Sequence, residues 1–430
     1  MRTKFIVAIL LILASTTTAQ TLEECQKAAE KNYPLIKQYG LIAQTTELTV
    51  SNIQKEWLPK IAVSAQATYQ SNVVAWPERI QSIYQQMGLT MKGLKKDQYK
   101  MAIDLQQTLY DGGTIASKQA IARQEAKVQE AENQTKLYQV HHRVNEMYFA
   151  LLLLNEQIKL NNNVKSLLLA SENKLAAMVK SGTAATSDLD NIKAERLSAE
   201  QQYTSLKAEQ QMLQHILTTF CGIKVENVQK PTPVSTDTLT NNRPELQLFN
   251  SKLKLSEAQE KALNTRLHPT LALFAQGYYG YPGMNMFNDM IDHKWRLNGI
   301  VGVKLSWNVG ALYTRKNDKA RLRLQRELIE NERKVFLFNN SMEQIRQNSN
   351  INRFKTMMQT DKEIIALRTN VRKAAESKLL HGIIDVNSLL REINNENAAK
   401  VQWAIHEIDM LKEIFNRQQQ DAPHRFRNIE

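Results

Sequence analysis

The sequence repeats one pattern of proline-bounded segments in its two halves. Pro34 and Pro59 flank one stretch with helical apolar periodicity, and Pro244 and Pro269 flank another, with the same separation of 25 residues in each pair. Proline is tolerated in the first turn of a helix and cannot continue one, so each pair is expected to bracket one helix of the same length. The chain is therefore predicted to use one module of about 200 residues twice, rather than two or three unrelated domains.

Each proline-bounded stretch is followed by two runs in which apolar and polar residues alternate. A period of two is typical of β-strands, and runs of about ten residues are long enough to cross a bilayer when tilted. The odd-numbered positions form the apolar face: Ile61, Val63, Ala65, Met101, Ile103, Leu105, Leu271, Leu273, Ala275, Val301, Val303 and Leu305. We expect this face to contact lipid. The alternative is a half-buried sheet of a soluble domain, which shows the same alternation.

Four of the five tryptophans lie at the ends of these runs. They are Trp57, Trp76, Trp295 and Trp307. Tryptophan is enriched where a membrane meets water, so these positions indicate interface residues of transmembrane strands. Core tryptophans of a β-sandwich are the alternative interpretation.

A long helical stretch follows each pair of strands. In the first, an apolar stripe with alternating steps of three and four residues runs from Leu137 to Ile158, which predicts packing against another helix. Each stretch breaks at a glycine, Gly182 or Gly382, and a second helix is expected to return after it. Good N-cap residues stand near the expected starts: Ser187, Asp188, Asn387 and Ser388. Both halves thus predict a β-β-α-hairpin module.

The N-terminus has the features of a secretory signal peptide. Basic residues precede an apolar run from Phe5 to Ala14, and the small residues Thr17 and Ala19 precede a cleavage site that would leave Gln20 first. We predict a signal peptide over residues 1–19 and export of the mature chain. No later apolar run is long enough for a transmembrane helix.

The chain has two cysteines, Cys25 and Cys221. A lipidated Cys25 is disfavoured, because Glu23 and Glu24 put charge where a lipobox needs small residues. In an oxidising compartment the two thiols could form one disulfide or remain buried thiols. We expect buried thiols, since nothing in the sequence shows that the two meet.

Four strands are too few to close a transmembrane barrel, and open strand edges are not tolerated in lipid. Two copies would give eight strands and a filled lumen, whereas three would give twelve and room for a pore. We therefore predict a homotrimer. The predicted fold is mainly α with a membrane β-barrel, in which two tandem β-β-α-hairpin repeats build a 12-stranded β-barrel continuous with a 12-column α-helical barrel.

This doubled arrangement resembles the TolC family of outer-membrane efflux proteins. The resemblance is carried by Asn32-Tyr33-Pro34, Arg243-Pro244-Glu245, Pro59, Pro269, Gly113, Gly310, Gly182 and Gly382. It implies a trimeric channel-tunnel in the outer membrane of a Gram-negative bacterium, with a long periplasmic extension. It also implies a periplasmic adaptor (membrane fusion) protein and an inner-membrane pump of the RND, ABC or MFS type as partners.

The expected division of the chain follows from the repeat and the resemblance. It is a signal peptide at 1–19, N-terminal helices at 20–58, strands and an external loop at 59–112, a first helical hairpin at 113–222, an equatorial linker at 223–242, a helix at 243–268, strands and an external loop at 269–309, a second hairpin at 310–417 and a polar, disordered or belt-bound tail at 418–430.

The resemblance implies two functional regions at the ends of the hairpins. Adaptor-docking tips are expected at Ser181, Gly182, Thr183, Ala184, His381, Gly382 and Ile383, and a periplasmic constriction at Asp188, Ile384, Asp385, Ser388 and Arg391. The basic partner that the family would pair with Asp188 aligns with Ile384, and the family's acidic ring positions align with Ser388 and Arg391. We expect a constriction less cation-selective than the family's norm. The alternative is that Arg391 pairs with Glu392 or Glu396 of a neighbouring helix.

Other classes of function have little support. No phosphate-binding glycine loop, nucleophile elbow or zinc-helix motif is present, and His141-His142 are expected to be solvated, so we predict no enzyme and no cofactor. The net charge is +13, but no aromatic-basic patch accompanies it. This argues against nucleic acid and favours outer membrane lipid as the acidic partner. Soft ligands for copper(I) gather at Met284, Met286, Met290 and His293, but we expect a flexible loop without metal.

The sequence therefore predicts a passive exit duct of a tripartite efflux or type I secretion system, for small molecules or proteins handed over by a pump and an adaptor. The alternative is a periplasmic coiled-coil adaptor or scaffold whose strands form a soluble domain.

Overall fold

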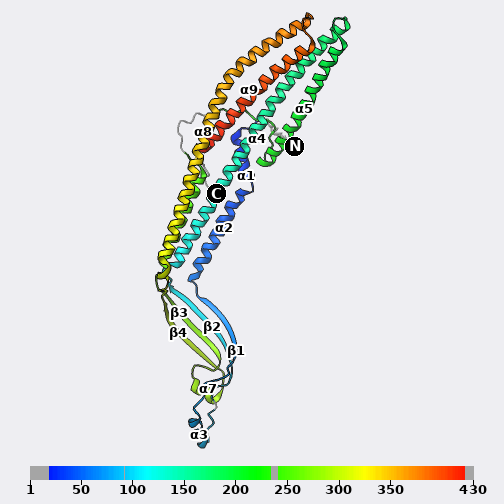
Figure 1. The fold of residues 1–430 in the computed structure, drawn as a ribbon. Coiled ribbons are helices and arrows are strands. Elements are labelled where there is room, and N and C mark those ends of the chain that lie inside the picture. The colour runs from blue at the N-terminus through cyan, green and yellow to red at the C-terminus, as the bar shows by residue number, and fades with distance from the viewer. Residues whose placement is uncertain (1–18, 92, 234–240, 422–430) are drawn as a thin grey trace, which may run out of the picture. The chain divides into compact units, whose positions relative to one another are not determined.

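The computed structural model describes residues 19–91, 93–233 and 241–421. The fold is mainly helical with one small sheet (Figure 1). In chain order the elements are α1 (Leu22–Asn32), α2 (Leu35–Gln54), the 3₁₀ turn η1 (Lys55–Trp57), β1 (Lys60–Tyr69), α3 (Glu78–Gln86), β2 (Asp97–Tyr110), α4 (Thr114–Lys180), α5 (Thr186–Cys221), α6 (Pro244–Thr265), β3 (Thr270–Tyr281), α7 (Met286–Asp292), β4 (Arg296–Ser306), α8 (Ala311–Leu380) and α9 (Val386–Asp421). Within the described ranges, no helix is both long and apolar enough to cross a membrane.

The second half of the chain repeats the element order of the first. A helix is followed by two strands with a short helix between them, then by a very long helix and a shorter returning one. The long helices α4 and α8 have 67 and 70 residues, and the returning helices α5 and α9 have 36 each. In Figure 1 α4 lies beside α5, and α8 lies beside α9, so each half builds one hairpin.

The strands form one antiparallel sheet in the order β1-β2-β3-β4. The register places Ile61 opposite Leu105, Leu105 opposite Ala275, and Ala275 opposite Val301. Paired residues in a sheet point to the same face, so the odd-numbered positions of all four strands share one face, as predicted. The strand β2 has 14 residues, longer than the predicted ten, and its pairing with β3 shifts between Thr108 and Tyr110.

The described chain divides into two compact units. Unit 1 comprises residues 1–40, 131–248 and 333–430, and unit 2 comprises residues 41–130 and 249–332, within the described ranges. Unit 1 contains α1, the linker, α5, α9 and the parts of α4 and α8 that lead to the hairpin tips. Unit 2 contains the sheet and its loops, most of α2 and α6, and the first turns of α4 and α8.

The main core of unit 1 is built on the predicted apolar stripe of α4. Leu137, Val144 and Leu151 are fully buried against side chains of α1, α5 and α9. His141, expected to be solvated, instead lies half-buried with its Nε2 3.5 Å from Glu30 Oε2. The linker also joins this core, because Val228 pairs with Gln20 in a parallel bridge. The Tyr148 hydroxyl lies within hydrogen-bond distance of the Gln20 and Gln229 carbonyl oxygens beside this bridge.

A second core of unit 1 lies near the hairpin tips. Leu168 and Leu175 of α4 pack there with Ile192 of α5 and with Leu389 and Ile393 of α9. This cluster joins the two hairpins of one chain, which the sequence pattern treated as separate modules.

The returning helices begin earlier than predicted. The helix α5 starts at Thr186 after Ala185, which provides no side-chain cap. The helix α9 starts at Val386 after Asp385, whose Oδ1 accepts the Ser388 N–H at 2.9 Å. The predicted N-caps were therefore wrong, because both helices start before those residues and, in α9, the Asp385 carboxylate takes the capping role. At the other end α9 continues to Asp421, so residues 418–421 are helical rather than tail.

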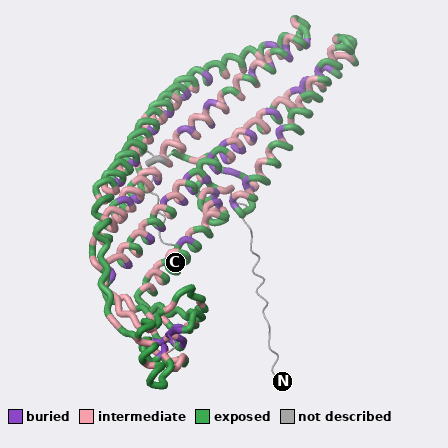
Figure 2. Tube along the Cα trace, turned by 60° about the horizontal axis from the view of Figure 1, so that its bottom comes forward, coloured by how far each residue is buried: buried purple, intermediate pink, exposed green. Residues whose placement is uncertain are grey.

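The loops of unit 2 have a small core of their own. Leu94, Tyr281 and Met290 are buried together, and Figure 2 shows such buried residues grouped among the exposed residues of the loops. The Asp289 carboxylate is fully buried and accepts from the Gly283 N–H at 2.6 Å and from Arg296 Nε at 3.0 Å. The loop between β3 and β4 is thus packed around the buried Asp289 and Met290.

Candidate functional site

The odd-numbered side chains of the strands form one exposed apolar face. Val63 is 77% exposed and Val301 71% exposed in the single chain, and Ile61, Ile103 and Leu305 are also exposed. Contiguous apolar surface of this kind marks contact with lipid or with another protein, because leaving it in water is unfavourable.

The even-numbered face carries polar groups that pair with one another. The Gln276 amide donates to the Asp104 carboxylate, and the Lys100 ammonium donates to Gln276 Oε1 at 2.9 Å. The same ammonium lies 4.4 Å from the centre of the Tyr278 ring. Such a face is suited to contact with water.

The outer strands of the sheet leave their outward edges unpaired. Among the described strands, β1 pairs with β2 alone and β4 with β3 alone. Each outward edge presents a row of backbone N–H and C=O groups that need partners in any medium without water.

Three of the four predicted interface tryptophans lie at strand ends. Trp57 precedes β1, Trp307 follows β4 and donates from Nε1 to the Leu267 carbonyl at 2.9 Å, and Trp295 stacks on Tyr99 with 5.7 Å between ring centres. Trp76 instead lies in the loop after β1, where its ring packs against Phe287 at 5.3 Å.

The two hairpin tips share one backbone conformation. Gly182 has a φ of +75° and Gly382 a φ of +67°. The Thr183 N–H donates to the Met178 carbonyl and the Ile383 N–H to the Lys378 carbonyl, each at 2.9 Å. This is a Schellman-type helix end, in which glycine adopts the left-handed conformation without strain.

The predicted docking residues at these tips are exposed, apart from Ala184, which is half-buried. Ile383 is 68% exposed. A Cβ added at Gly182 or Gly382 would have no atom within 4 Å. Both tips are therefore open surface in the single chain.

The predicted constriction residues lie at the starts of α5 and α9. Asp188 is in the first turn of α5, and Ser388 and Arg391 are in the first two turns of α9. Ile384 packs against the tip core, which makes it a packing residue. The side-chain and backbone hydrogen bonds from Ser388 to Asp385 hold the pKa of that carboxyl below its usual value.

Arg391 is exposed on α9, and both carboxylates considered as its partners are engaged elsewhere in the same chain. Glu392 lies 3.6 Å from Arg368. Glu396 binds Arg372 and, at 2.6 Å, Lys400. In the part of the chain that the structure describes, no carboxylate lies within salt-bridge distance of Arg391.

Sequence analysis missed the buried ion cluster around Glu396. Arg372, Lys400 and Thr369 all donate to this carboxylate, which is 4% exposed. Burial raises the pKa of Glu396, but these hydrogen bonds outweigh burial and leave the pKa below its usual value. The pairs Arg372/Glu376 and Glu396/Lys400 have the i, i+4 spacing of helical ion pairs, which is the signal that could have revealed the cluster.

The Arg243-Pro244-Glu245 motif forms an ion pair at the start of α6. Arg243 donates from Nε and Nη2 to the two oxygens of Glu245, and its guanidinium lies 4.5 Å from the centre of the Tyr138 ring. Burial lowers the pKa of Arg243, but the bond to Glu245 outweighs it and the pKa is raised. The motif therefore has a structural role in unit 1.

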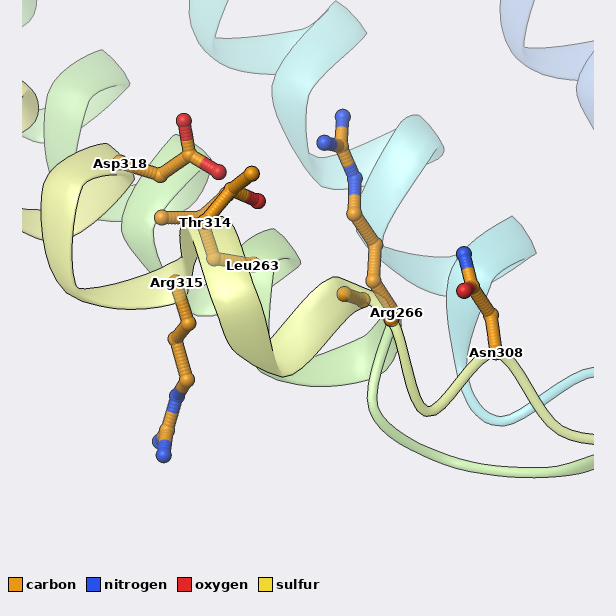
Figure 3. Close-up of a pocket in the computed structure, with 8 residues that line it drawn as sticks. Leu263, Arg266, Asn308, Thr314, Arg315 and Asp318 are labelled. Atoms are coloured by element: carbon orange, nitrogen blue, oxygen red, sulfur yellow. The ribbon is translucent and has the colours of Figure 1, made fainter.

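The cavity in Figure 3 has a volume of about 260 Å³ and lies where α6 ends and α8 begins. The side chains of Arg266 and Arg315 point in opposite directions there, and Arg315 donates to Asn264 Oδ1 at 3.2 Å. In the methionine loop Met290 is buried, Met284 and Met286 are exposed, and His293 Nε2 lies 2.7 Å from the Gly93 carbonyl.

The family profile of outer membrane efflux proteins matches residues 26–222, from α1 to the end of the first hairpin. This part of the chain is therefore similar to outer membrane efflux proteins. The resemblance predicted from the sequence is thereby confirmed. The family is one of transport channels and not of enzymes. Comparison with curated protein sequences finds no match.

Solved structures of outer-membrane proteins share the fold over nearly the whole chain. The outer-membrane channel OprN has a TM-score of 0.66 at 14% identity, covering 93% of this chain and 90% of that one. VceC from Vibrio cholerae has 0.66 at 11% identity, covering 93% and 96%, and CmeC from Campylobacter jejuni has 0.66 at 13%, covering 94% and 85%. The likeness at these identities is one of fold, and it extends beyond the family match into the second repeat.

Proposed function

We propose that this protein is the passive exit duct of a tripartite efflux or type I secretion assembly. The observation that carries the proposal is the four-stranded sheet, which has an exposed apolar face, a polar opposite face and two unpaired edges. A sheet of this kind is complete only when its edges meet other strands and its apolar face meets lipid.

Three copies would complete the sheet. The outward edge of β4 in one copy would pair with the outward edge of β1 in the next, which closes a 12-stranded barrel with its apolar face outside. The polar face with Lys100, Asp104 and Gln276 would line the lumen. Two copies would also close a ring, but one too narrow for an open pore.

The helix α8 supports the same assembly. Four apolar residues of this helix follow one another at steps of three and four residues, and all are exposed in the single chain: Val335, Phe338, Met342 and Ile345. This spacing forms a coiled-coil seam that the described residues of the chain leave exposed. A neighbouring copy in the trimer would supply one.

The adaptor or scaffold alternative is disfavoured by the same surfaces. A soluble protein would leave both the apolar face of the sheet and the α8 seam in water, at a large unfavourable free energy. The exposed tips at Gly182 and Gly382 are the surfaces we assign to a periplasmic adaptor, which links the duct to an inner-membrane pump.

The location and assembly can be tested on purified envelopes. Extraction that needs detergent, followed by a mass in detergent equal to three chains, is the expected result. Release by carbonate or high salt alone would contradict the membrane barrel, and a monomeric or dimeric mass would contradict the trimer.

A matched pair of variants tests which face meets lipid. Val63→Arg places a charge on the apolar face of β1, and Ser64→Arg places it on the opposite face one residue away. Arginine on the lipid face of a barrel costs about 2–4 kcal/mol near the bilayer centre, whereas lumen positions tolerate it. We expect Val63→Arg to deplete the outer-membrane fraction and Ser64→Arg to leave it unchanged; equal effects would reject the assignment of faces.

A further inference from the structure

The only two cysteines of the chain meet in the core of unit 1. Cys25 lies on α1, and Cys221 is the last residue of α5, 196 positions further along the sequence. Their side chains are 0% and 1% exposed. The Cys221 thiol donates to the Cys25 carbonyl oxygen at 3.4 Å, and both cysteines are free thiols in the structure.

Neighbouring contacts hold these two chain segments together independently of the thiols. The Asn32 side-chain amide donates to the Thr219 and Phe220 carbonyls at 3.1 and 3.2 Å. The Tyr33 and Phe220 rings lie 5.4 Å apart. At Gly222, which caps α5 with a φ of +69°, any Cβ would lie 2.6 Å from the Asn32 side chain. The meeting of the cysteines is therefore a fixed feature of the packing.

A metal site does not explain the pair. Across the described residues, no group of three histidine, cysteine or carboxylate side chains could hold a metal ion. The side chains around the pair are apolar, among them Leu137, Val144 and Leu217.

We infer that Cys25 and Cys221 form an intramolecular disulfide in the exported protein. The inference rests on the proposed function only through export, which places the chain in a compartment where disulfides persist. Because the chain has just two cysteines, no competing pairing within one chain exists. The bond would tie α1 to the end of the first hairpin and close a loop that contains β1, β2, α4 and α5.

The bond must form while the core is still open. In the folded, reduced protein the interaction with Cys221 and burial raise the pKa of the Cys25 thiol far above its usual value, whereas the interaction with Cys25 lowers the pKa of the Cys221 thiol. Cys25 therefore supplies almost no thiolate, and only Cys221 could react. An oxidant also has no access to side chains buried to this extent. Oxidation during folding avoids both obstacles.

The oxidant we assign is the disulfide of a periplasmic thiol–disulfide oxidoreductase. The thiolate of one cysteine attacks that disulfide, forms a mixed disulfide and releases the first oxidant sulfur as a thiolate. The second cysteine thiolate then attacks the sulfur of the first cysteine and releases the other oxidant sulfur. Two electrons pass to the oxidant, and the protons lost by the two cysteines are balanced by those taken up by its two thiolates.

Thiol blocking on the wild-type protein tests the inference without any substitution. Cells are treated with N-ethylmaleimide, and the protein from the outer-membrane fraction is unfolded in guanidinium with more of the reagent and weighed intact. We expect no adduct before reduction and two adducts when reduction precedes blocking. Two adducts without reductant would overturn the inference, and so would a disulfide-linked dimer. Recovery of the reduced chain from the cytoplasm would reject export and the proposed function together, whereas free thiols in the outer-membrane fraction reject the disulfide alone.

A stability measurement separates a covalent bond from simple packing. A disulfide that closes a loop of this length restrains the unfolded chain, so reductant should lower the unfolding temperature of the wild type, on the order of 5 °C. The Cys25→Ala/Cys221→Ala double variant should show no response to reductant. If reductant lowered the unfolding temperature of both proteins equally, or left that of the wild type unchanged, the cysteines would contribute only as packed side chains.

Discussion

Arg372 on α8 donates to the carboxylate of Glu396 on α9, and the first hairpin has the corresponding bridge with its charges reversed. There Glu172 of α4 accepts from Arg196 of α5 at 2.6 Å. In each hairpin one partner lies ten residues before the tip glycine and the other fourteen residues after it. The two repeats have kept the position of the bridge and exchanged its polarity, which shows that the position serves to join an outgoing helix to its returning helix.

Removal of Arg372 should destabilise the second hairpin. Arg372→Ala leaves the buried Glu396 carboxylate short of a cation, which we expect to cost about 2 kcal/mol of unfolding free energy. The exposed pair Arg323/Glu327 is the matched control, and Arg323→Ala should cost about 0.3 kcal/mol. Thermal unfolding of both variants checks the difference, and equal losses would contradict a structural role for the buried bridge.

The same carboxylate predicts how stability depends on pH. The pKa of Glu396 is lower in the folded than in the unfolded chain, so the unfolded state binds more protons in the acid range. The stabilisation from Glu396 is complete above the usual glutamate pKa and is lost as the pH falls through the folded value. Glu396→Gln should therefore be less stable than the wild type at pH 7, and the two should converge at low pH. A difference that persists unchanged to pH 3 would show that the ionised form is not what stabilises the hairpin.

Substitution at the tip glycines should separate docking from folding. Asparagine tolerates the left-handed conformation, whereas valine does not, and each adds a side chain in open space. We expect Gly382→Asn to keep the trimer and its unfolding temperature but to lose export, because the adaptor would meet a new side chain. Gly382→Val should lose export and should also destabilise the protein, because valine in the left-handed conformation adds about 1–2 kcal/mol of strain. Normal export by Gly382→Asn would exclude this tip from the docking surface.

Arg391 should influence ion selectivity at the periplasmic end. With Glu392 and Glu396 held by other cations, three copies of Arg391 near a narrow axis would repel cations. Single-channel recordings in planar bilayers should show that Arg391→Asp shifts selectivity toward cations. Arg323→Asp makes the same change in charge on another helix, α8, and should leave the selectivity unchanged. Identical reversal potentials for the wild type and Arg391→Asp would place Arg391 away from the pore.

The order of helices and strands in this protein can be predicted from local patterns in its sequence. The prolines at 34, 59, 244 and 269 bracket helices in the structure, and the alternation after them gives strands whose odd-numbered residues share one face. The tip glycines end α4 and α8 as predicted. These features depend on the conformation of a few neighbouring residues, so a local pattern is enough to determine them.

The tertiary structure decided which distant residues meet. It placed Cys25 against Cys221, and it supplied Arg368 and Arg372 to the carboxylates that sequence analysis had considered for Arg391. Each of these contacts joins elements or turns whose relative position comes from helix packing around the cores of unit 1. Periodicity shows which face of a helix is buried but not which neighbour covers it, and that choice depends on the packing of the whole hairpin pair.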